Sequence, residues 1–279
     1  MLWNLIFFNF TTKKIPMKKV LLTICLSVIC YSNFAQDKLF EPVVAKKPRH
    51  GFILTGNADF DIPAADMAKR FGLSYRAGFG VLYKTEGNWL IGTKFDFILG
   101  NIIKEDSLMI NIRDKYNTMP LGKYVEMINS TGNRVGIPIY ERGYAVGIEA
   151  GKIFNFNKLK PDNGVMALTT VGFMQHKIDI FDQEKAVQSI SGNYLKGYDR
   201  LTNGIFVEQY LGYVYFSKSK LINFHLGIDA LFGFTQGRRD YLYDVMRTDT
   251  KQRLDILYGL RGGWYIPMFK RKSEDLLFE

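Results

Sequence analysis

The sequence is poor in cysteine, histidine and proline for a chain of 279 residues. Its two cysteines, Cys25 and Cys30, both lie close to the N-terminus, so the rest of the chain can form neither a disulfide framework nor a thiolate metal site. The three histidines, His50, His176 and His225, are far apart and form no His-rich metal motif. We therefore expect no bound metal and no cofactor.

Long apolar runs are also missing beyond the N-terminal region, where no stretch is apolar and uncharged for the length that a membrane-spanning helix needs. The N-terminal region itself has the pattern of a secretory signal, because Lys18 and Lys19 precede the apolar stretch 20–29 and Ala35 lies at a suitable cleavage point. We interpret residues 1–16 as an upstream extension of the reading frame.

The chain also lacks a basic stripe interleaved with aromatic side chains. Its formal net charge is +10, but four of the lysines lie in the first 35 residues, which the signal pattern predicts to be removed. An exported chain with an ordinary charge distribution is not typical of nucleic-acid-binding proteins. We therefore expect no nucleic-acid partner.

What the sequence has in abundance is regular alternation of apolar and polar residues. In residues 221–234, for example, Phe224 and Leu226 alternate with His225 and Asp229. A β-strand sends successive side chains to opposite faces, so such a segment has one apolar face and one polar face. Seven of eight segments share this pattern; the fifth is apolar on both faces, which leaves its orientation open. The segments are 51–62, 73–84, 88–101, 142–154, 165–178, 204–216, 221–234 and 253–269.

The connections between these segments alternate between short and long. The short ones span 86–88, 155–164 and 217–220, and the long ones span 63–72, 102–141, 179–203 and 236–252. Short periplasmic turns and longer external loops are typical of outer-membrane barrels, in which the apolar face meets lipid and the polar face lines the lumen. The sequence therefore predicts an all-β fold: an eight-stranded antiparallel up-and-down transmembrane β-barrel.

These boundaries divide the chain into four parts. An even number of strands places both ends of the barrel on the periplasmic side. We expect an upstream extension plus signal peptide in 1–35, a periplasmic linker in 36–50, the outer-membrane barrel in 51–269 and a periplasmic tail in 270–279.

Charged residues recur on the face that the alternation assigns to the lumen. The predicted lumen set is Asp59, Arg76, Lys94, Asp96, Glu149, Glu208, His225, Asp229, Arg253, Asp255 and Arg261. The interior of an eight-stranded barrel is just wide enough for side chains to fill it. An unpaired charge there would cost several kcal/mol, so we expect these groups to pair and to plug the barrel. A narrow polar path or a buried active site is the alternative interpretation.

The long connections carry the candidate binding residues. They combine tyrosine and arginine, which are favoured at protein interfaces, with glycine and asparagine. The candidates are Tyr194, Tyr198, Arg200, Arg238, Arg239 and Tyr241. Arg238 and Arg239 could also contact lipopolysaccharide phosphates, because guanidinium groups bind phosphate oxygens in pairs.

His176, near the external end of the fifth segment, is the residue that an enzymatic function would depend on. Barrel hydrolases that act on lipid A use a His–Ser pair with an acid near that rim, and Ser189 and Ser191 lie in the adjoining loop, but nothing in the sequence fixes their geometry. The acids Asp240, Asp244 and Asp249 match no calcium-binding loop. We therefore expect a protein that is not an enzyme.

Several stretches resemble a known group of proteins. The signal end at 33–36 and the stretches GFMQHKI (172–178), GYDRLTNG (197–204) and FTQGRRD (234–240) are similar to segments of small outer-membrane β-barrel proteins of the Bacteroidota, a poorly characterised family. The architecture is similar to that of the outer-membrane protein A and X type barrels. The resemblance implies the fold and the location, and it carries no catalytic residues.

Together these observations predict a non-enzymatic outer-membrane barrel with a structural or partner-docking role and a plugged lumen. A narrow pore for small solutes and a lipid-modifying enzyme remain alternatives. The expected partners are outer-membrane lipid, lipopolysaccharide and other envelope proteins.

Overall fold

The computed structural model describes residues 47–114, 122–157, 159–182, 187–217 and 222–269, all within the unit Ala45–Glu279. The predicted signal peptide, its cleavage point and the tail lie outside the described residues. The strands are β1 (Gly51–Ala64), β2 (Ser74–Lys84), β3 (Trp89–Gly100), β4 (Tyr124–Ile128), β5 (Arg134–Phe154), β6 (Gly164–Ile180), β7 (Thr202–Phe216), β8 (Asn223–Gly237) and β9 (Gln252–Phe269). The helices are α2 (Ala65–Ala68), η1 (Gln188–Ile190) and η2 (Gly192–Gly197). No helix in these ranges is long and apolar enough to cross a membrane.

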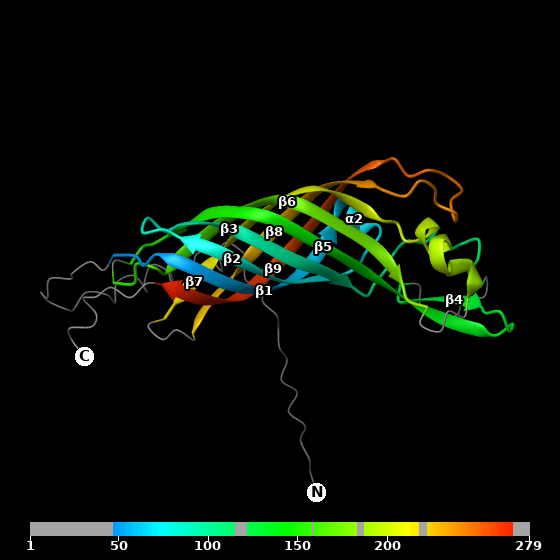
Figure 1. Ribbon diagram of the computed structural model, residues 1–279, viewed down its shortest axis with the longest axis horizontal. Helices are drawn as coiled ribbons and strands as arrows, with labels where there is room; N and C mark the ends of the chain where they lie inside the picture. The colour runs from blue at the N-terminus through cyan, green and yellow to red at the C-terminus, as the bar shows by residue number, and fades with distance from the viewer. Residues whose placement is uncertain (1–46, 115–121, 158, 183–186, 218–221, 270–279) are drawn as a thin grey trace, which may run out of the picture. The chain divides into compact units, whose positions relative to one another are not determined.

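Eight of the strands form a closed ring (Figure 1). Each of them pairs antiparallel with its neighbours in the chain, β1 also pairs with β9, and β3 pairs with β5 across the intervening β4. The closing pair runs from Gly51 opposite Phe269 to Ala64 opposite Ile256. The predicted eight-stranded antiparallel barrel is therefore confirmed.

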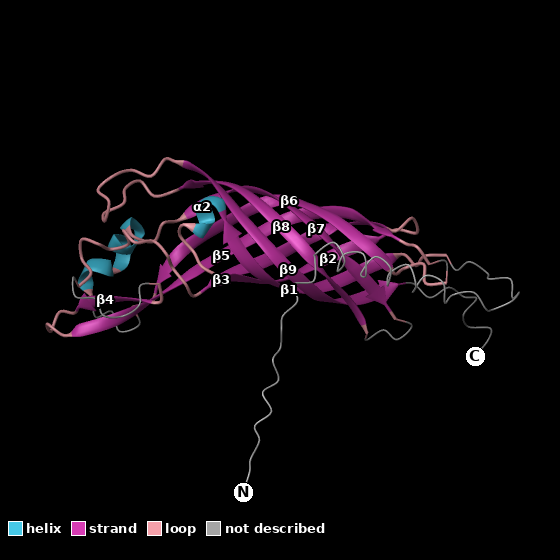
Figure 2. Cartoon of the chain, turned by 180° about the vertical axis from the view of Figure 1, so that it is seen from behind, coloured by secondary structure: helices cyan, strands magenta, loops and turns pink. Residues whose placement is uncertain are grey.

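The ninth strand, β4, lies outside the ring and was not predicted. It pairs only with the first residues of β5, from Tyr124 opposite Pro138 to Ile128 opposite Arg134. As a result β5 begins at Arg134 rather than at Arg142. The alternation in β4 covers too few residues to predict a strand. Figure 2 shows this hairpin at the same end of the barrel as α2.

The outer surface of the barrel is apolar along its strands. Large side chains that point away from the lumen are well exposed, among them Phe79 (61%), Ile148 (65%) and Leu226 (63%). An apolar surface of this extent does not belong in water, and on a closed barrel it is the surface that meets lipid. The polar groups of the backbone are satisfied within the ring, as a membrane span requires. The barrel is a transmembrane barrel.

Strand β6 is the segment whose orientation the alternation left open. Its even-numbered residues, including Met166, Met174 and His176, are buried in the lumen, whereas Val171 and Phe173 face outward. Both faces are apolar because β6 contributes to the two apolar clusters that fill the ends of the lumen. A strand with apolar residues on both faces has no polar alternation from which its orientation could be read.

Two apolar clusters fill the lumen on either side of its charged middle. The periplasmic apolar cluster comprises Ile53, Leu82, Leu90, Ile153, Met166, Leu168, Tyr210, Val214, Phe216 and Tyr265. The external apolar cluster begins inside the barrel with Ile98, Met174, Phe206, Leu231 and Leu257. It continues into the long connections with Met67, Phe71, Ile103, Met109, Met127 and Tyr198. The external loops are therefore packed onto the barrel by buried apolar side chains.

Candidate functional site

The middle of the lumen holds a group of buried charges, called here the central charge network. Its members are Asp59, Asp61, Arg76, Lys94, Asp96, Glu208, Asp229 and Arg261, each at most 5% exposed. They come from β1, β2, β3, β7, β8 and β9, so the network connects opposite walls of the barrel.

Arg76 has contacts with three strands of the wall. Its Nε and one terminal nitrogen donate to the two carboxylate oxygens of Asp61, at 2.7 and 2.9 Å. The other terminal nitrogen donates to Oε1 of Glu208 at 2.7 Å, and Asp229 accepts a further bond. Four of the five N–H groups of this guanidinium are therefore bonded, which offsets much of the cost of its burial.

Glu208 lies where the three cations meet. Arg261 donates to it and also to Oδ1 of Asp59 at 2.6 Å, and the Lys94 ammonium contacts both Glu208 and Oδ2 of Asp96, the latter at 2.7 Å. Each cation therefore bridges at least two carboxylates. The side chains fill the cross-section of the barrel in the way that an eight-stranded ring allows.

Glycines in the neighbouring strands make room for the network. A Cβ at Gly78 would lie 2.1 Å from Oδ1 of Asp96, and a Cβ at Gly259 would lie 2.2 Å from Oδ1 of Asp61. Any other residue at these two positions would push a carboxylate out of its ion pairs. The glycines on the lumen face are therefore part of the site.

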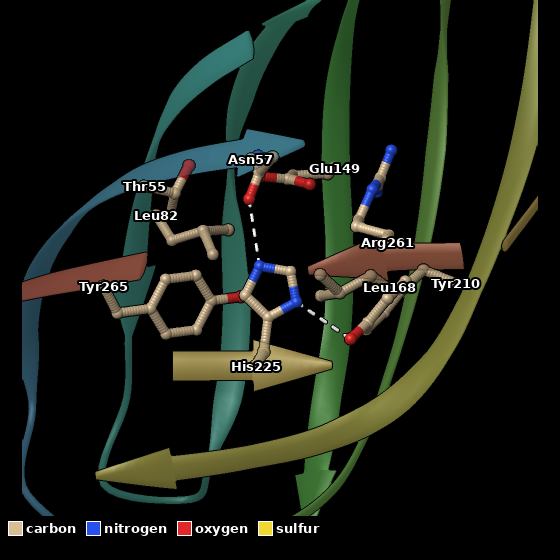
Figure 3. Close-up of a pocket in the computed structure, with 9 residues that line it drawn as sticks. All are labelled: Thr55, Asn57, Leu82, Glu149, Leu168, Tyr210, His225, Arg261 and Tyr265. Carbon is tan, nitrogen blue, oxygen red and sulfur yellow. Dashed lines mark hydrogen bonds between the residues drawn. The ribbon is translucent and has the colours of Figure 1, made fainter. Parts of the chain in front are cut away.

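Glu149 lies beside the central charge network but outside its ion pairs. Its side chain is 3% exposed, and no ion pair or hydrogen bond of its carboxylate is found among the described residues. It lines a cavity of about 10 Å³, together with Thr55 and Arg261, as Figure 3 shows. A polar cavity of that size has room for about one water molecule.

The same cavity contains His225, whose two ring nitrogens are both bonded (Figure 3). Oδ1 of Asn57 can only accept, so Nε2 of His225 carries the proton and donates to it at 3.0 Å. Nδ1 then accepts from the Tyr210 hydroxyl at 2.8 Å. This assignment keeps the imidazole neutral between the charge network and the periplasmic apolar cluster.

A second polar group lies at the external end of the lumen, around His176. A guanidinium can only donate, so Nδ1 of His176 accepts from Arg70 at 3.1 Å, and Nε2 donates to Asp255 at 2.9 Å. Arg70 reaches this position from the α2–β2 connection and also bonds Thr202 at 3.1 Å. Burial lowers the pKa of Arg70, although Asp255 raises it in part. His176 is fully buried and is not the exposed rim residue that the enzymatic reading requires.

The predicted lumen residues are buried, with one exception. Arg253 lies at the external end of β9, and its guanidinium pairs with Asp249 at 2.6 Å, away from the central network. The sequence reasoning missed Asp61, although it shares a face with Asp59 and the alternation could have identified it. It also missed Arg70, for which no periodic signal exists because the residue lies in a loop.

The periplasmic end of the lumen is covered by the β5–β6 connection. The Asp162 carboxylate in that connection accepts from Lys84 at 2.8 Å and from Nε of Arg49 at 2.6 Å. The Arg49 guanidinium also lies over the ring of Phe269, 4.9 Å from its centre. Burial raises the pKa of Asp162, but the Lys84 and Arg49 cations outweigh it and hold that pKa below its ordinary value.

The external loops are tied together by a buried ion pair. Arg200 donates twice to Asp244, at 2.8 and 2.9 Å, and Asp244 also accepts from the backbone N–H of Met109 at 3.0 Å. Three long connections thus meet at one carboxylate. We call the described parts of these three connections (β3–β4, β6–β7 and β8–β9), which meet at the Arg200–Asp244 pair, the loop platform.

The candidate binding residues occupy different places in this platform. Tyr198 and Arg200 are each 4% exposed, so these two candidates hold the loops together and do not project into solvent. Arg239 pairs with Asp199, whose bond raises the pKa of Arg239, and Arg238 bonds the side chain of Asn203. The exposed candidates are Arg238, Tyr194 (63%) and Tyr241 (42%). Which candidates are buried and which are exposed depends on how the loops pack, and the sequence has no periodic signal for loop packing.

The fold and the surface define the class of protein. A closed, even-numbered antiparallel barrel with an apolar exterior, a polar lumen and long loops at one end is the architecture of outer-membrane proteins. The protein is therefore an outer-membrane β-barrel. Among the described residues no group of His, Cys, Asp and Glu side chains is arranged to hold a metal ion.

Comparisons with known proteins add only distant likenesses. No protein-family model matches the chain, and no curated protein matches it. Among solved structures it is similar to Neisserial surface protein A, with 8% identity, a TM-score of 0.43 and coverage of 80% of this chain and 100% of that one. Ail of Yersinia pestis has 12% identity, coverage of 78% and 97%, and a TM-score of 0.37. OprG of Pseudomonas aeruginosa has 10% identity, coverage of 79% and 97%, and a TM-score of 0.36.

Proposed function

We propose that the protein is a non-conducting, non-enzymatic barrel that presents an ordered loop platform to partners outside the cell. The observation that carries this proposal is the filled lumen. Arg76, Lys94 and Arg261 join carboxylates on opposite walls, and an apolar cluster lies on either side of them. A barrel closed in this way acts through its surfaces.

The narrow-pore alternative has less support from this geometry. A solute path would have to pass the Arg76 and Arg261 guanidinium groups, both within bonding distance of Glu208. Opening the path would leave buried charges without partners, at a cost of several kcal/mol for each. The apolar clusters at the two ends would add a barrier to water and ions.

The lipid-modifying alternative depended on a histidine that could accept a proton from a serine. Nδ1 of His176 already accepts from Arg70, and Nε2 donates to Asp255. No nitrogen remains to activate a hydroxyl group. Ser189 lines an external hollow with Tyr194 and Tyr243, not the lumen position of His176.

Conductance across planar lipid bilayers tests the closed lumen. Protein that has refolded, as judged by heat-modifiable gel mobility, should give no stable ion current. A steady current from folded wild-type protein would contradict the proposal. The matched variant Arg134→Ala, on the external hairpin, should also remain silent, because its pair with Asp114 lies outside the lumen.

The partners follow from the same surfaces. We propose that the apolar exterior contacts outer-membrane lipid, that external basic groups meet lipopolysaccharide, and that the loop platform docks other molecules. Arg238 and Arg239 are already bonded to Asn203 and Asp199, which leaves fewer of their donors for phosphate. The finer assignment to the barrels of the Bacteroidota rests on the similar sequence stretches alone.

A further inference from the structure

The loop platform contains an open hollow of about 510 Å³, here called the tyrosine hollow. Its lining comes from two loops, the β6–β7 connection with its helices η1 and η2, and the β8–β9 connection. The lining residues are Gln188, Ser189, Tyr194, Tyr198 and Tyr243. Its volume is typical of sites for small organic molecules.

The wall of the hollow is held in place before any ligand binds. The Tyr198 and Tyr243 rings pack edge to face, with centres 5.7 Å apart. The backbone N–H of Tyr243 donates to the carbonyl of Gly197 at 3.1 Å. A Cβ at Gly197 would lie 2.0 Å from the Tyr243 ring, so only glycine allows this close approach. The amide of Asn111 donates to the Tyr198 hydroxyl and to the Tyr243 carbonyl, both at 3.3 Å.

The buried ion pair of the loop platform supports the same wall. Asp244 follows Tyr243 in the chain and is bonded twice by Arg200. This pair limits the movement of the loop that carries the Tyr243 ring. A preformed wall reduces the ordering that binding would otherwise require, which favours affinity for a small ligand.

The lining selects the chemistry of the ligand. Among the described residues no charged side chain lines the hollow, and the nearby charges Arg200 and Asp244 are already paired with each other. A charged ligand would therefore find no counter-ion among these lining residues. Tyrosine offers an apolar ring face and a hydroxyl group, while glutamine and serine offer both donors and acceptors. This combination fits a ligand that is uncharged and that has apolar faces edged by hydroxyl groups.

An extended peptide is less well matched. Strand addition needs a free sheet edge, and the backbone around the hollow forms the 3₁₀ helices η1 and η2. We infer that the tyrosine hollow binds a short neutral oligosaccharide, with its sugar rings against the exposed rings of Tyr194 and Tyr243. This inference rests on the proposed function, because it requires the loop platform to be a binding surface.

An array that carries neutral, sulfated and sialylated oligosaccharides tests the inference on the full chain in detergent micelles. We expect retention of neutral oligosaccharides that does not weaken as salt is raised, because no ion pairs form. Retention of charged sugars alone, with loss at high salt, would overturn the inference, as would retention of none. Tyrosine-rich and proline-rich peptides on the same array test the other occupant, and their retention in place of sugar would overturn the inference too.

Variants localise the binding to the hollow. Tyr194 is 63% exposed, so Tyr194→Ala should fold normally and weaken retention roughly tenfold through loss of one stacking face. Tyr194→Phe should keep most of the binding, because the ring face remains. Tyr124→Ala is the matched control, since Tyr124 is exposed on β4 and does not line the hollow. Equal binding by Tyr194→Ala and wild type would contradict the assignment.

The two proposals fail in different ways. A steady current in bilayers would overturn the closed lumen whatever the array shows. A silent barrel that retains no neutral sugar would remove the tyrosine hollow as a saccharide site and would leave the closed lumen intact.

Discussion

Two buried glutamates in neighbouring parts of the lumen differ in whether a cation contacts their carboxylate. In the central charge network, Glu208 has contacts with Arg76, Lys94 and Arg261. One layer nearer the periplasmic end, Glu149 is buried beside a cavity of about 10 Å³ and forms no ion pair among the described residues. Both residues are nearly inaccessible to solvent. The same side chain therefore joins three cations in one place and is buried without a direct ion pair in the other.

The difference shows that burial alone does not decide what a charge contributes. Removing one partner from a buried ion pair leaves the remaining charges unpaired, which costs several kcal/mol. Removing a buried charge that has no partner takes away a desolvation cost instead. Substitutions in the two regions should therefore change the free energy of unfolding in opposite directions.

The largest effect is expected at Arg76. Arg76→Ala would leave Asp61, Glu208 and Asp229 without their shared guanidinium and should lower the free energy of unfolding by about 3–5 kcal/mol. Urea unfolding in lipid vesicles, followed by the heat-modifiable folded band, measures it. Lys69→Ala is the control, because its largely exposed pair with Asp66 should contribute no more than about 1 kcal/mol. Similar losses in both variants would show that the network contributes little.

The comparison itself is tested by two isosteric changes. Glu208→Gln should lower the free energy of unfolding by about 2–4 kcal/mol, because three cations lose a carboxylate. Glu149→Gln should raise it by about 1 kcal/mol, because a neutral amide is less costly to bury. The same unfolding assay at neutral pH measures both. A loss of stability in Glu149→Gln would mean that its carboxylate is compensated in solution.

The smallest effect on the free energy of unfolding is expected at Asp162, in the β5–β6 connection that covers the periplasmic end of the lumen. The pKa of Asp162 is lowered in the folded protein, so its contribution is fully present above its ordinary pKa and is lost as pH falls through the folded value. Asp162→Asn should destabilise the protein by about 1 kcal/mol at neutral pH, with the deficit shrinking below about pH 4. Unfolding midpoints of both proteins across acidic pH measure this. A deficit that stays constant down to the lowest pH would exclude Asp162 as the source.

Much of the fold could be predicted because the alternation in strands is strict. The segment at 73–84 matches β2 to within one residue, and the inward positions of Arg76 and Asp229 follow from parity alone. A hairpin as short as β4 with the start of β5 is below the length at which alternation is informative. Composition identifies Tyr198 and Arg200 as candidate binding residues, but it does not show which loop side chains are buried.

By itself the sequence determined which side of the wall the residues of seven of the eight segments face, because successive side chains alternate and the barrel has only two faces. Only the tertiary structure decided which acid meets which cation, since those contacts join strands that are far apart in the chain. It also decided the orientation of β6, the protonated nitrogen of His176 and the hollow between two loops. Each of these depends on a three-dimensional neighbour, which no local pattern in the sequence specifies.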